Sequence, residues 1–187
     1  MLAPPSALLK AIAVALALFG AASVNAQAAP PSAGRAAIEP SLLRELIAWA
    51  AEHRGRPLPA PGEAPALEAL PDEELKGIVC TDLAEYACRG LVAAYEPGRK
   101  RIVYLATLDM RLAFDRSFIV HELVHWLQHR DGQAHAGASC RAVMAAEREA
   151  YAAQNRYLHH HKVGRRMGGM MKFVGCPPED GAPAASP

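Results

Sequence analysis

Apolar side chains follow a helical spacing most densely just past the middle of the chain. The segment from Ser117 to Arg130 carries so many of them that we expect a buried helix. Ser117 or Asp115 is placed as its N-cap, and Asp131-Gly132 follows its end, where glycine can take the left-handed conformation that closes a helix. The apolar residues that surround the centre of this segment are Phe118, Ile119, Val120, Leu123, Val124, Trp126 and Leu127.

Weaker helical patterns lie on both sides of this segment. Residues 40–52 turn most of their large apolar side chains to one side, which predicts an amphipathic helix. Residues 142–158 are rich in the strong helix formers Ala, Glu, Arg and Gln and predict another. A further short helix is expected between residues 67 and 91.

A strand is predicted before the central helix. The β-branched and aromatic run Arg101–Leu105 lies between Pro97-Gly98 and Asp109, as strands bounded by turn residues do. A strand in that position could form the edge of a sheet, to which an extended peptide adds by backbone hydrogen bonds. Together these elements predict the α+β class, as one mostly helical domain with a short sheet before its central helix.

The amino-terminal residues have the order of a secretory signal peptide. Lys10 precedes an apolar run, residues 11–22, and Ser23-Val24-Asn25-Ala26 follows it. The run is shorter than the about 20 residues that a membrane-spanning helix needs. We therefore expect residues 1–26 to be a signal peptide cleaved after Ala26, no stable membrane insertion of the mature chain, and a location in the periplasm or outside the cell.

The mature chain has the length of a single domain. Residues 27–39 are rich in Ala, Pro and Ser and residues 177–187 resemble a loose tail, so both are expected to be disordered and the domain to occupy residues 40–176. The 187-residue chain has a formal net charge of +1, and loss of Lys10 with the leader leaves the mature chain neutral. That balance predicts neither nucleic acid nor an anionic membrane as a partner, and the sequence predicts no particular oligomeric state.

All four cysteines lie beyond the signal peptide, and an even number of cysteines in an exported chain favours disulfides. Three pairings are possible. We favour Cys80 with Cys88 and Cys140 with Cys176, because the second bridge would tie the carboxy-terminal segment to the start of the 142–158 helix. The competing interpretation, a cysteine-ligated zinc site, is disfavoured because the chain has no Cys-x-x-Cys pair.

The central helix carries the motif His121-Glu122-Leu123-Val124-His125. Residues four apart share one face of a helix, so both imidazoles can bind one Zn²⁺. Glu122 points about 100° round the helix from His121, where its carboxylate can act on a metal-bound water without being a ligand. This spacing is the signature of zinc hydrolases, and it predicts one zinc ion per chain with Glu122 as the general base.

A catalytic zinc site has three protein ligands and one open position, so a third ligand is expected elsewhere in the chain. Glu147 and Glu149 lie on the 142–158 helix but about 200° apart around its axis, so only one of them can face the metal. We favour Glu147, which follows the bulkier apolar stripe of that helix, whereas Glu149 shares its side with small residues.

Two residues between the helices are alternative third ligands. Asp131 lies where another class of zinc peptidases places its ligand after a glycine turn, but this chain has Gln128 in place of that glycine, so the backbone cannot easily reverse there. His135 lies on the loop from Gly132 to Gly137, where a solvated histidine is the simpler interpretation.

The motif, followed by Glu147-Arg148-Glu149-Ala150-Tyr151, resembles the gluzincin group of zinc metallopeptidases, whose third ligand is a glutamate on a following helix. The resemblance covers residues 100–158. It implies a zincin-like fold, a zinc site made by His121, His125 and Glu147, and a peptide or protein substrate. Several gluzincin families have Glu-x-x-Ala-Asp at this place, whereas here Tyr151 stands at the aspartate position. This departure leaves the ligand assignment standing, but it removes the carboxylate that contacts a zinc histidine in those families.

In the mechanism that the resemblance implies, zinc lowers the pKa of a bound water and polarises the carbonyl, while Glu122 takes the proton and returns it to the leaving nitrogen. Tyr104, Tyr151 and Tyr157 are candidate donors to the oxyanion. The alternative hypothesis is a non-catalytic exported metal-binding or scaffold protein that retains the fold. A di-iron carboxylate protein is disfavoured because the chain has no second Glu-x-x-His pair.

Overall fold

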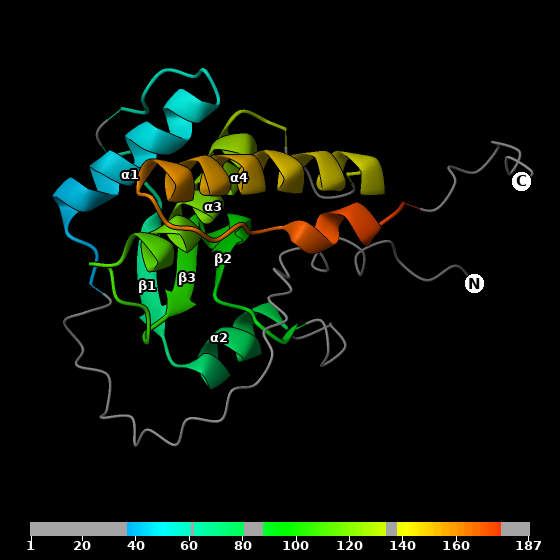
Figure 1. The fold of residues 1–187 in the computed structure, drawn as a ribbon. Coiled ribbons are helices and arrows are strands. Elements are labelled where there is room, and N and C mark those ends of the chain that lie inside the picture. Colours follow the sequence, from blue (N-terminus) through cyan, green and yellow to red (C-terminus); the bar gives the residue numbers. More distant parts are fainter. Residues whose placement is uncertain (1–36, 61, 81–87, 134–137, 177–187) are drawn as a thin grey trace, which may run out of the picture.

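The computed structural model describes residues 37–60, 62–80, 88–133 and 138–176 (Figure 1). The α-helices in these ranges are α1 (Pro40–His53), α2 (Asp72–Val79), α3 (Ala113–Arg130) and α4 (Cys140–His160). Two short 3-10 helices are η3 (Pro97–Arg99) and η4 (Gly169–Phe173). The strands are β1 (Ala66–Leu70), β2 (Ala93–Glu96) and β3 (Arg101–Leu105).

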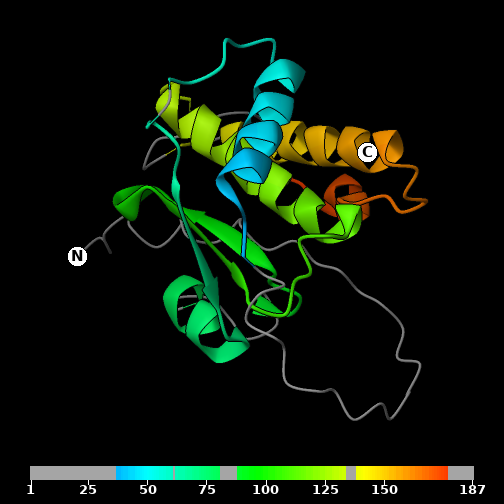
Figure 2. The ribbon, with the colours of Figure 1, turned by 90° about the vertical axis from the view of Figure 1, so that its left-hand side faces the viewer.

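The three strands form one small sheet in the order β1-β3-β2. β1 pairs with β3 in parallel, and β2 pairs with β3 antiparallel. Helices α1, α3 and α4 lie on one side of the sheet and α2 on the other, as the two perpendicular views show (Figure 1, Figure 2). This mixed architecture agrees with the expected α+β class and with a short sheet before the central helix.

β3 is the central strand and is covered on both faces. Ile102 and Tyr104 belong to the core beneath α3, whereas Val103 points to the opposite face and packs in a second cluster with Leu75 of α2. The strand at Arg101–Leu105 is confirmed, but it is not a sheet edge, the place that the sequence left open for it; its continuous apolar run is the pattern of a strand covered on both faces. The edges are β1 and β2, whose alanines and glutamates carry little strand propensity.

Helix α3 begins one turn earlier than expected, and its N-cap is Leu112. Ser117 is instead buried inside the helix, where its hydroxyl accepts a hydrogen bond from Gln154 of α4. Asp115 lies in the first turn, where its negative charge is favourable to the helix dipole. The helix ends as expected before Gly132, whose φ of +73° is the left-handed conformation that glycine tolerates.

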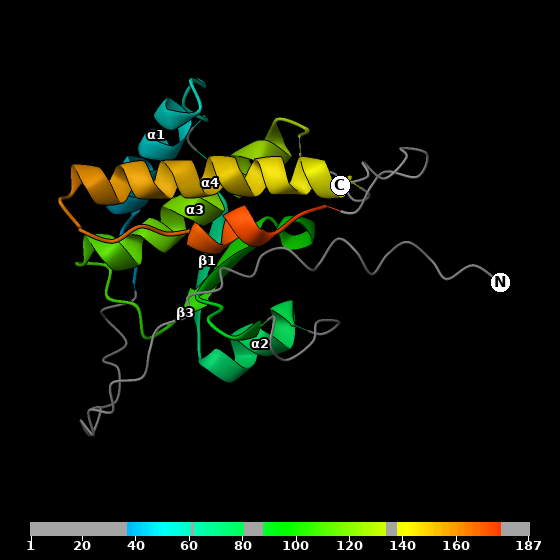
Figure 3. The same cartoon turned by 45° about the vertical axis from the view of Figure 1, so that its right-hand side comes forward.

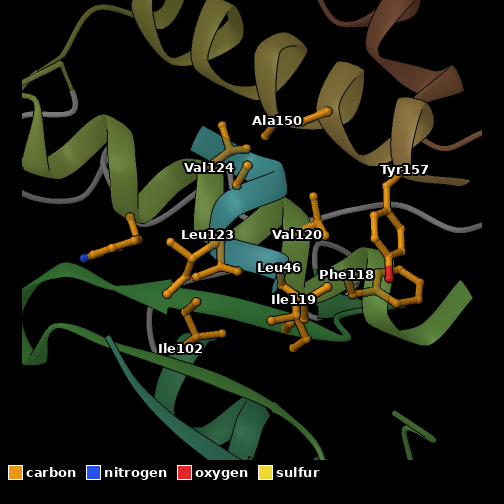
Figure 4. Packing of buried hydrophobic residues seen from close by; sticks show 14 of the residues in the cluster. Leu46, Ile102, Phe118, Ile119, Val120, Leu123, Val124, Ala150 and Tyr157 are labelled. Atoms are coloured by element: carbon orange, nitrogen blue, oxygen red, sulfur yellow. The ribbon is translucent and has the colours of Figure 1, made fainter. Parts of the chain in front are cut away.

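The motif helix is held in place by the main core. Leu123 and Ile119 belong to one cluster with Leu46 of α1 and Ile102 of β3, and all four are fully buried (Figure 4). Burying each such side chain stabilises the fold by about 1.5–3 kcal/mol. α3 also packs along α4 through Val124. The middle of α3, which carries the motif, is therefore fixed on two sides.

Two disulfides join the pairs favoured from the sequence, Cys80–Cys88 and Cys140–Cys176. The second joins the first residue of α4 to the segment that follows η4, which lies beside α4 (Figure 1, Figure 3). Disulfides are typical of proteins from oxidising compartments, so both bridges are consistent with export.

The expected signal peptide, residues 1–26, lies outside the described residues, as do residues 27–36 and 177–187, for which disorder is expected. Within the described ranges, no helix combines the length and the apolar character that crossing a bilayer requires.

Candidate metal centre

Helices α3 and α4 bring three potential metal ligands to one point. His121 and His125 lie one turn apart on α3, and Glu147 faces them from α4. The two Nε2 atoms are 3.1 Å apart, while one carboxylate oxygen of Glu147 lies 3.4 Å from Nε2 of His121 and the other 3.2 Å from Nε2 of His125. Ligands at about 2.0–2.1 Å from a tetrahedral zinc ion are about 3.4 Å from one another. The three groups are therefore spaced as ligands of one ion would be.

The two glutamates of α4 have different surroundings. Glu147 is only 5 % exposed and belongs to the cluster, as its place in the apolar stripe predicts. Glu149 instead accepts a hydrogen bond from Arg54, the residue that follows α1, at 2.8 Å. Asp131 also binds Arg54, at 2.9 Å, and is not part of the cluster, while His135 lies outside the described residues.

A mutual ion pair compensates the charges of this cluster in the metal-free protein. Burial alone would lower the pKa of His125, but the carboxylate of Glu147, with smaller contributions from Glu122 and Gln128, raises it to about 9. Burial alone would raise the pKa of Glu147, but His125 and His121 lower it to about 2. A cation bound at this point would replace the proton that His125 holds in its ion pair with Glu147, because imidazole nitrogen and carboxylate oxygen are both common zinc ligands.

Glu122 lies beside the cluster, and a backbone group of β2 holds its carboxylate. The side chain is buried, and its Oε2 accepts a hydrogen bond from the amide of Tyr95 at 2.8 Å. β2 pairs with β3 along one side only in the described part of the chain, so this amide lies at an edge of the sheet. The candidate base is thus placed next to the candidate ligands, at the edge of β2.

The two histidines differ at their second ring nitrogen. Nδ1 of His125 lies 2.9 Å from Oε1 of Gln128. Nδ1 of His121 is buried and has no hydrogen-bond partner among the described residues. The ring of Tyr151 packs against His121 instead, with 4.5 Å between the ring centroids. An aromatic contact therefore takes the place that the aspartate has in the gluzincin pattern.

The three tyrosines considered as oxyanion donors are spread over the fold. Tyr151 lies at the centre, and burial, together with Glu147 and Glu122, raises the pKa of its hydroxyl, which keeps its proton at neutral pH. Tyr157 packs against Trp49, away from the three ligands, and Tyr104 lies on the central strand.

Two contacts of the centre were not expected from the sequence. From the sequence, Gln128 is identified only as the residue that replaces a glycine, although its place three residues after His125 on one helix face is a spacing that indicates a contact. The hydrogen bond from the amide of Tyr95 could not be predicted from the sequence. The sequence of β2 has no strand pattern, and every residue except proline has a backbone N–H, so residue type does not indicate which one binds Glu122.

Comparison of the chain with known proteins identifies the family to which it belongs. No curated protein and no solved structure matches the chain. A family model described as a domain of unknown function, DUF6647, matches residues 35–182. This match takes in every helix and strand described above, including the candidate metal centre. The chain therefore belongs to the DUF6647 family.

Proposed function

We propose that this protein is a zinc-dependent hydrolase that cleaves peptide bonds. The proposal is carried by one observation, the convergence of His121, His125 and Glu147 beside the carboxylate of Glu122. Two imidazoles and one carboxylate suffice to hold a metal ion, so a further buried carboxylate next to them is most simply explained as a general base.

His121, His125 and Glu147 would hold the zinc ion in this proposal. Three protein ligands are the usual number in catalytic zinc sites, because they leave a coordination position open. When bound, zinc supplies Lewis-acid polarisation of the substrate carbonyl and lowers the pKa of water.

Glu122 is the proposed base. Its carboxylate takes a proton from the attacking water and delivers it to the leaving nitrogen, which becomes the new amino terminus. The Tyr95 amide, 2.8 Å from Oε2, keeps the carboxylate from rotating away. Tyr151 is the proposed donor to the developing oxyanion, because its hydroxyl is held protonated beside the ligands.

Strand β2 is the proposed substrate edge. An extended peptide that adds alongside β2 would pass next to Glu122, since the outward amide of Tyr95 meets that side chain. β3 cannot serve, because both of its sides are already paired.

Zinc content and peptide hydrolysis test this proposal together. We expect elemental analysis of the metal-replete mature protein to find one zinc per chain, and mass spectrometry to find cleavage products in a mixture of unblocked peptides. Glu122→Gln is expected to keep the zinc and to lower the hydrolysis rate by about 10²-fold or more. Glu147→Ala is expected to lose the zinc. Glu73→Gln, which changes an exposed glutamate of α2, is the matched control and should behave as the wild type.

The outcomes separate the two hypotheses. A Glu122→Gln variant that keeps its zinc and cleaves as fast as the wild type would contradict the mechanism. Zinc in the wild type without cleavage of any peptide would favour the alternative, a non-catalytic metal-binding protein. Absence of zinc from metal-replete wild type would remove the metal site itself.

A further inference from the structure

We infer that Gln128, Glu149 and Arg54 form a hydrogen-bonded chain that selects the tautomer and orientation of His125 as a metal ligand. The inference rests on the proposed metal site and adds the residues that position one of its ligands. Gln128 belongs to α3, Glu149 to α4, and Arg54 follows the last residue of α1. Three helices therefore contribute to the placement of one imidazole.

The orientation of the Gln128 amide follows from what surrounds it. Its Nε2 lies 2.7 Å from Oε2 of Glu149 and 3.0 Å from the carbonyl oxygen of Ala146. A carbonyl oxygen only accepts hydrogen bonds, and so does a carboxylate that is paired with a guanidinium. Both neighbours therefore require the NH₂ end of the amide, and the reverse orientation would place an oxygen against two acceptors.

The oxygen of the same amide must then face His125. Oε1 of Gln128 lies 2.9 Å from Nδ1 of His125, and since an amide oxygen only accepts, Nδ1 carries the hydrogen. In the ion pair with Glu147 both ring nitrogens carry a hydrogen; when a bound cation displaces the proton of Nε2, the hydrogen stays on Nδ1 and Nε2 presents its lone pair. Nε2 is the atom that faces Glu147 and His121. The chain thus selects the tautomer that a metal ligand requires.

Arg54 anchors the far end of the chain. Its side chain is only 2 % exposed, and it donates from Nε to Glu149 at 2.8 Å and from a terminal nitrogen to Asp131 at 2.9 Å. A buried guanidinium destabilises the fold unless it is paired, so the carboxylates of Glu149 and Asp131 are kept in place beside it. Glu149 is consequently fixed on the side where Gln128 needs an acceptor.

Zinc affinity, measured without any substrate, tests this positioning role. The dissociation constant of Zn²⁺ is determined by competition with a chromophoric chelator for the wild type, Gln128→Ala and Gln154→Ala. Gln154 is the matched control, since it is also a fully buried glutamine between α3 and α4, but its side chain donates to Ser117 and, among the described residues, to no candidate metal ligand. We expect Gln128→Ala to raise the dissociation constant about 10–100-fold and Gln154→Ala to leave it unchanged.

A reversal of hydrogen-bond polarity separates positioning from packing. Gln128→Glu alone places two carboxylates side by side and is expected to weaken zinc binding. Adding Glu149→Gln restores the alternation at residue 149, because the new amide can donate to the new carboxylate and still accept from Arg54, while the new carboxylate accepts from His125. The carbonyl oxygen of Ala146 still faces a carboxylate oxygen, so we expect the double variant to bind zinc more tightly than Gln128→Glu alone but less tightly than the wild type.

Equal zinc affinity of Gln128→Ala and the wild type would overturn the inference, and so would equal losses in Gln128→Ala and Gln154→Ala. If Gln128→Ala does not fold, the polarity reversal decides: no recovery in the double variant overturns the inference. The proposed activity fails separately, because a wild type that binds zinc tightly and cleaves nothing removes the hydrolase while a Gln128-dependent affinity still supports the chain.

Discussion

His121 and His125 show how one residue type acquires two environments on a single helix. His125 is bonded at both ring nitrogens, to Gln128 and to Glu147. His121 contacts Glu147 with one nitrogen and packs its ring on Tyr151. Polar contacts at both nitrogens fix the direction of the first imidazole, whereas the second has such contacts at Nε2 only and is otherwise restrained by packing.

The pair of His125 and Glu147 makes the stability of the metal-free protein depend on pH. The pKa of Glu147 is lowered from 4.5 to about 2, so its contribution is present above pH 4.5 and is lost as the pH falls towards 2. The pKa of His125 is raised from 6.5 to about 9, so its contribution is complete below pH 6.5 and is lost as the pH rises through 9. The stabilisation is therefore largest between pH 4.5 and 6.5.

Urea unfolding of metal-free wild type and Glu147→Gln measures this contribution. We expect the difference in free energy of unfolding between the two proteins to be larger near pH 6.5 than above pH 9, where His125 has lost its proton. A difference that is the same at both pH values would show that the ion pair does not form.

At the scale of elements, the segment that follows α4 packs against Tyr151, the residue that contacts His121 of the candidate metal centre. Asn155 of α4 forms two hydrogen bonds with the backbone of Met167, at 3.0 and 2.7 Å. The next residue, Gly168, has a φ of +72° and lies directly against the ring of Tyr151. Since that ring packs on His121, the turn indirectly restrains a candidate ligand.

Gly168→Ala is expected to destabilise the protein by roughly 1–3 kcal/mol. A Cβ atom at this position would lie 2.5 Å from Cγ of Tyr151, and the left-handed backbone is strained for alanine in any case. Gly164→Ala is the matched control, because nothing lies within 4 Å of its Cβ position. Thermal unfolding of both variants compares them, and equal changes in melting temperature would contradict the packing argument.

At the scale of the whole molecule, one main core is shared by α1, α3, α4 and one face of the sheet, and a disulfide joins the carboxy-terminal segment to the first residue of α4. The disulfide Cys140–Cys176 spans 36 residues and Cys80–Cys88 spans 8. A cross-link restricts the unfolded chain more when it closes a longer loop.

Removing the disulfide that closes the longer loop should therefore lower the free energy of unfolding more. We expect a double Cys→Ser change at Cys140 and Cys176 to lower the free energy of unfolding by about 4 kcal/mol, and the same change at Cys80 and Cys88 by about 2.5 kcal/mol. Denaturant unfolding under non-reducing conditions measures both values. A larger loss from the shorter loop would show that native-state contacts of the bridges dominate over loop length.

Much of the candidate centre could be predicted, because both the pairing of the two histidines and the choice between the two glutamates depend only on spacing within a single helix. His121 and His125 share a face at any place where their segment is helical, and the apolar stripe distinguished Glu147 from Glu149. The N-cap of α3 was predicted wrongly, because Ser117 satisfies its hydroxyl inside the core and not at a helix end.

The sequence by itself determined where the main helices lie and the face that carries the histidines, since helical periodicity is a property of the chain alone. It favoured the two disulfide pairs, but the choice among three possible pairings was made by the tertiary structure. Only the tertiary structure decided that Arg101–Leu105 is a central strand, that the Tyr95 amide meets Glu122, and that Arg54 reaches Glu149 across 95 residues. These contacts join segments far apart in the chain, so they depend on how the helices pack on the sheet, which no short-range pattern encodes.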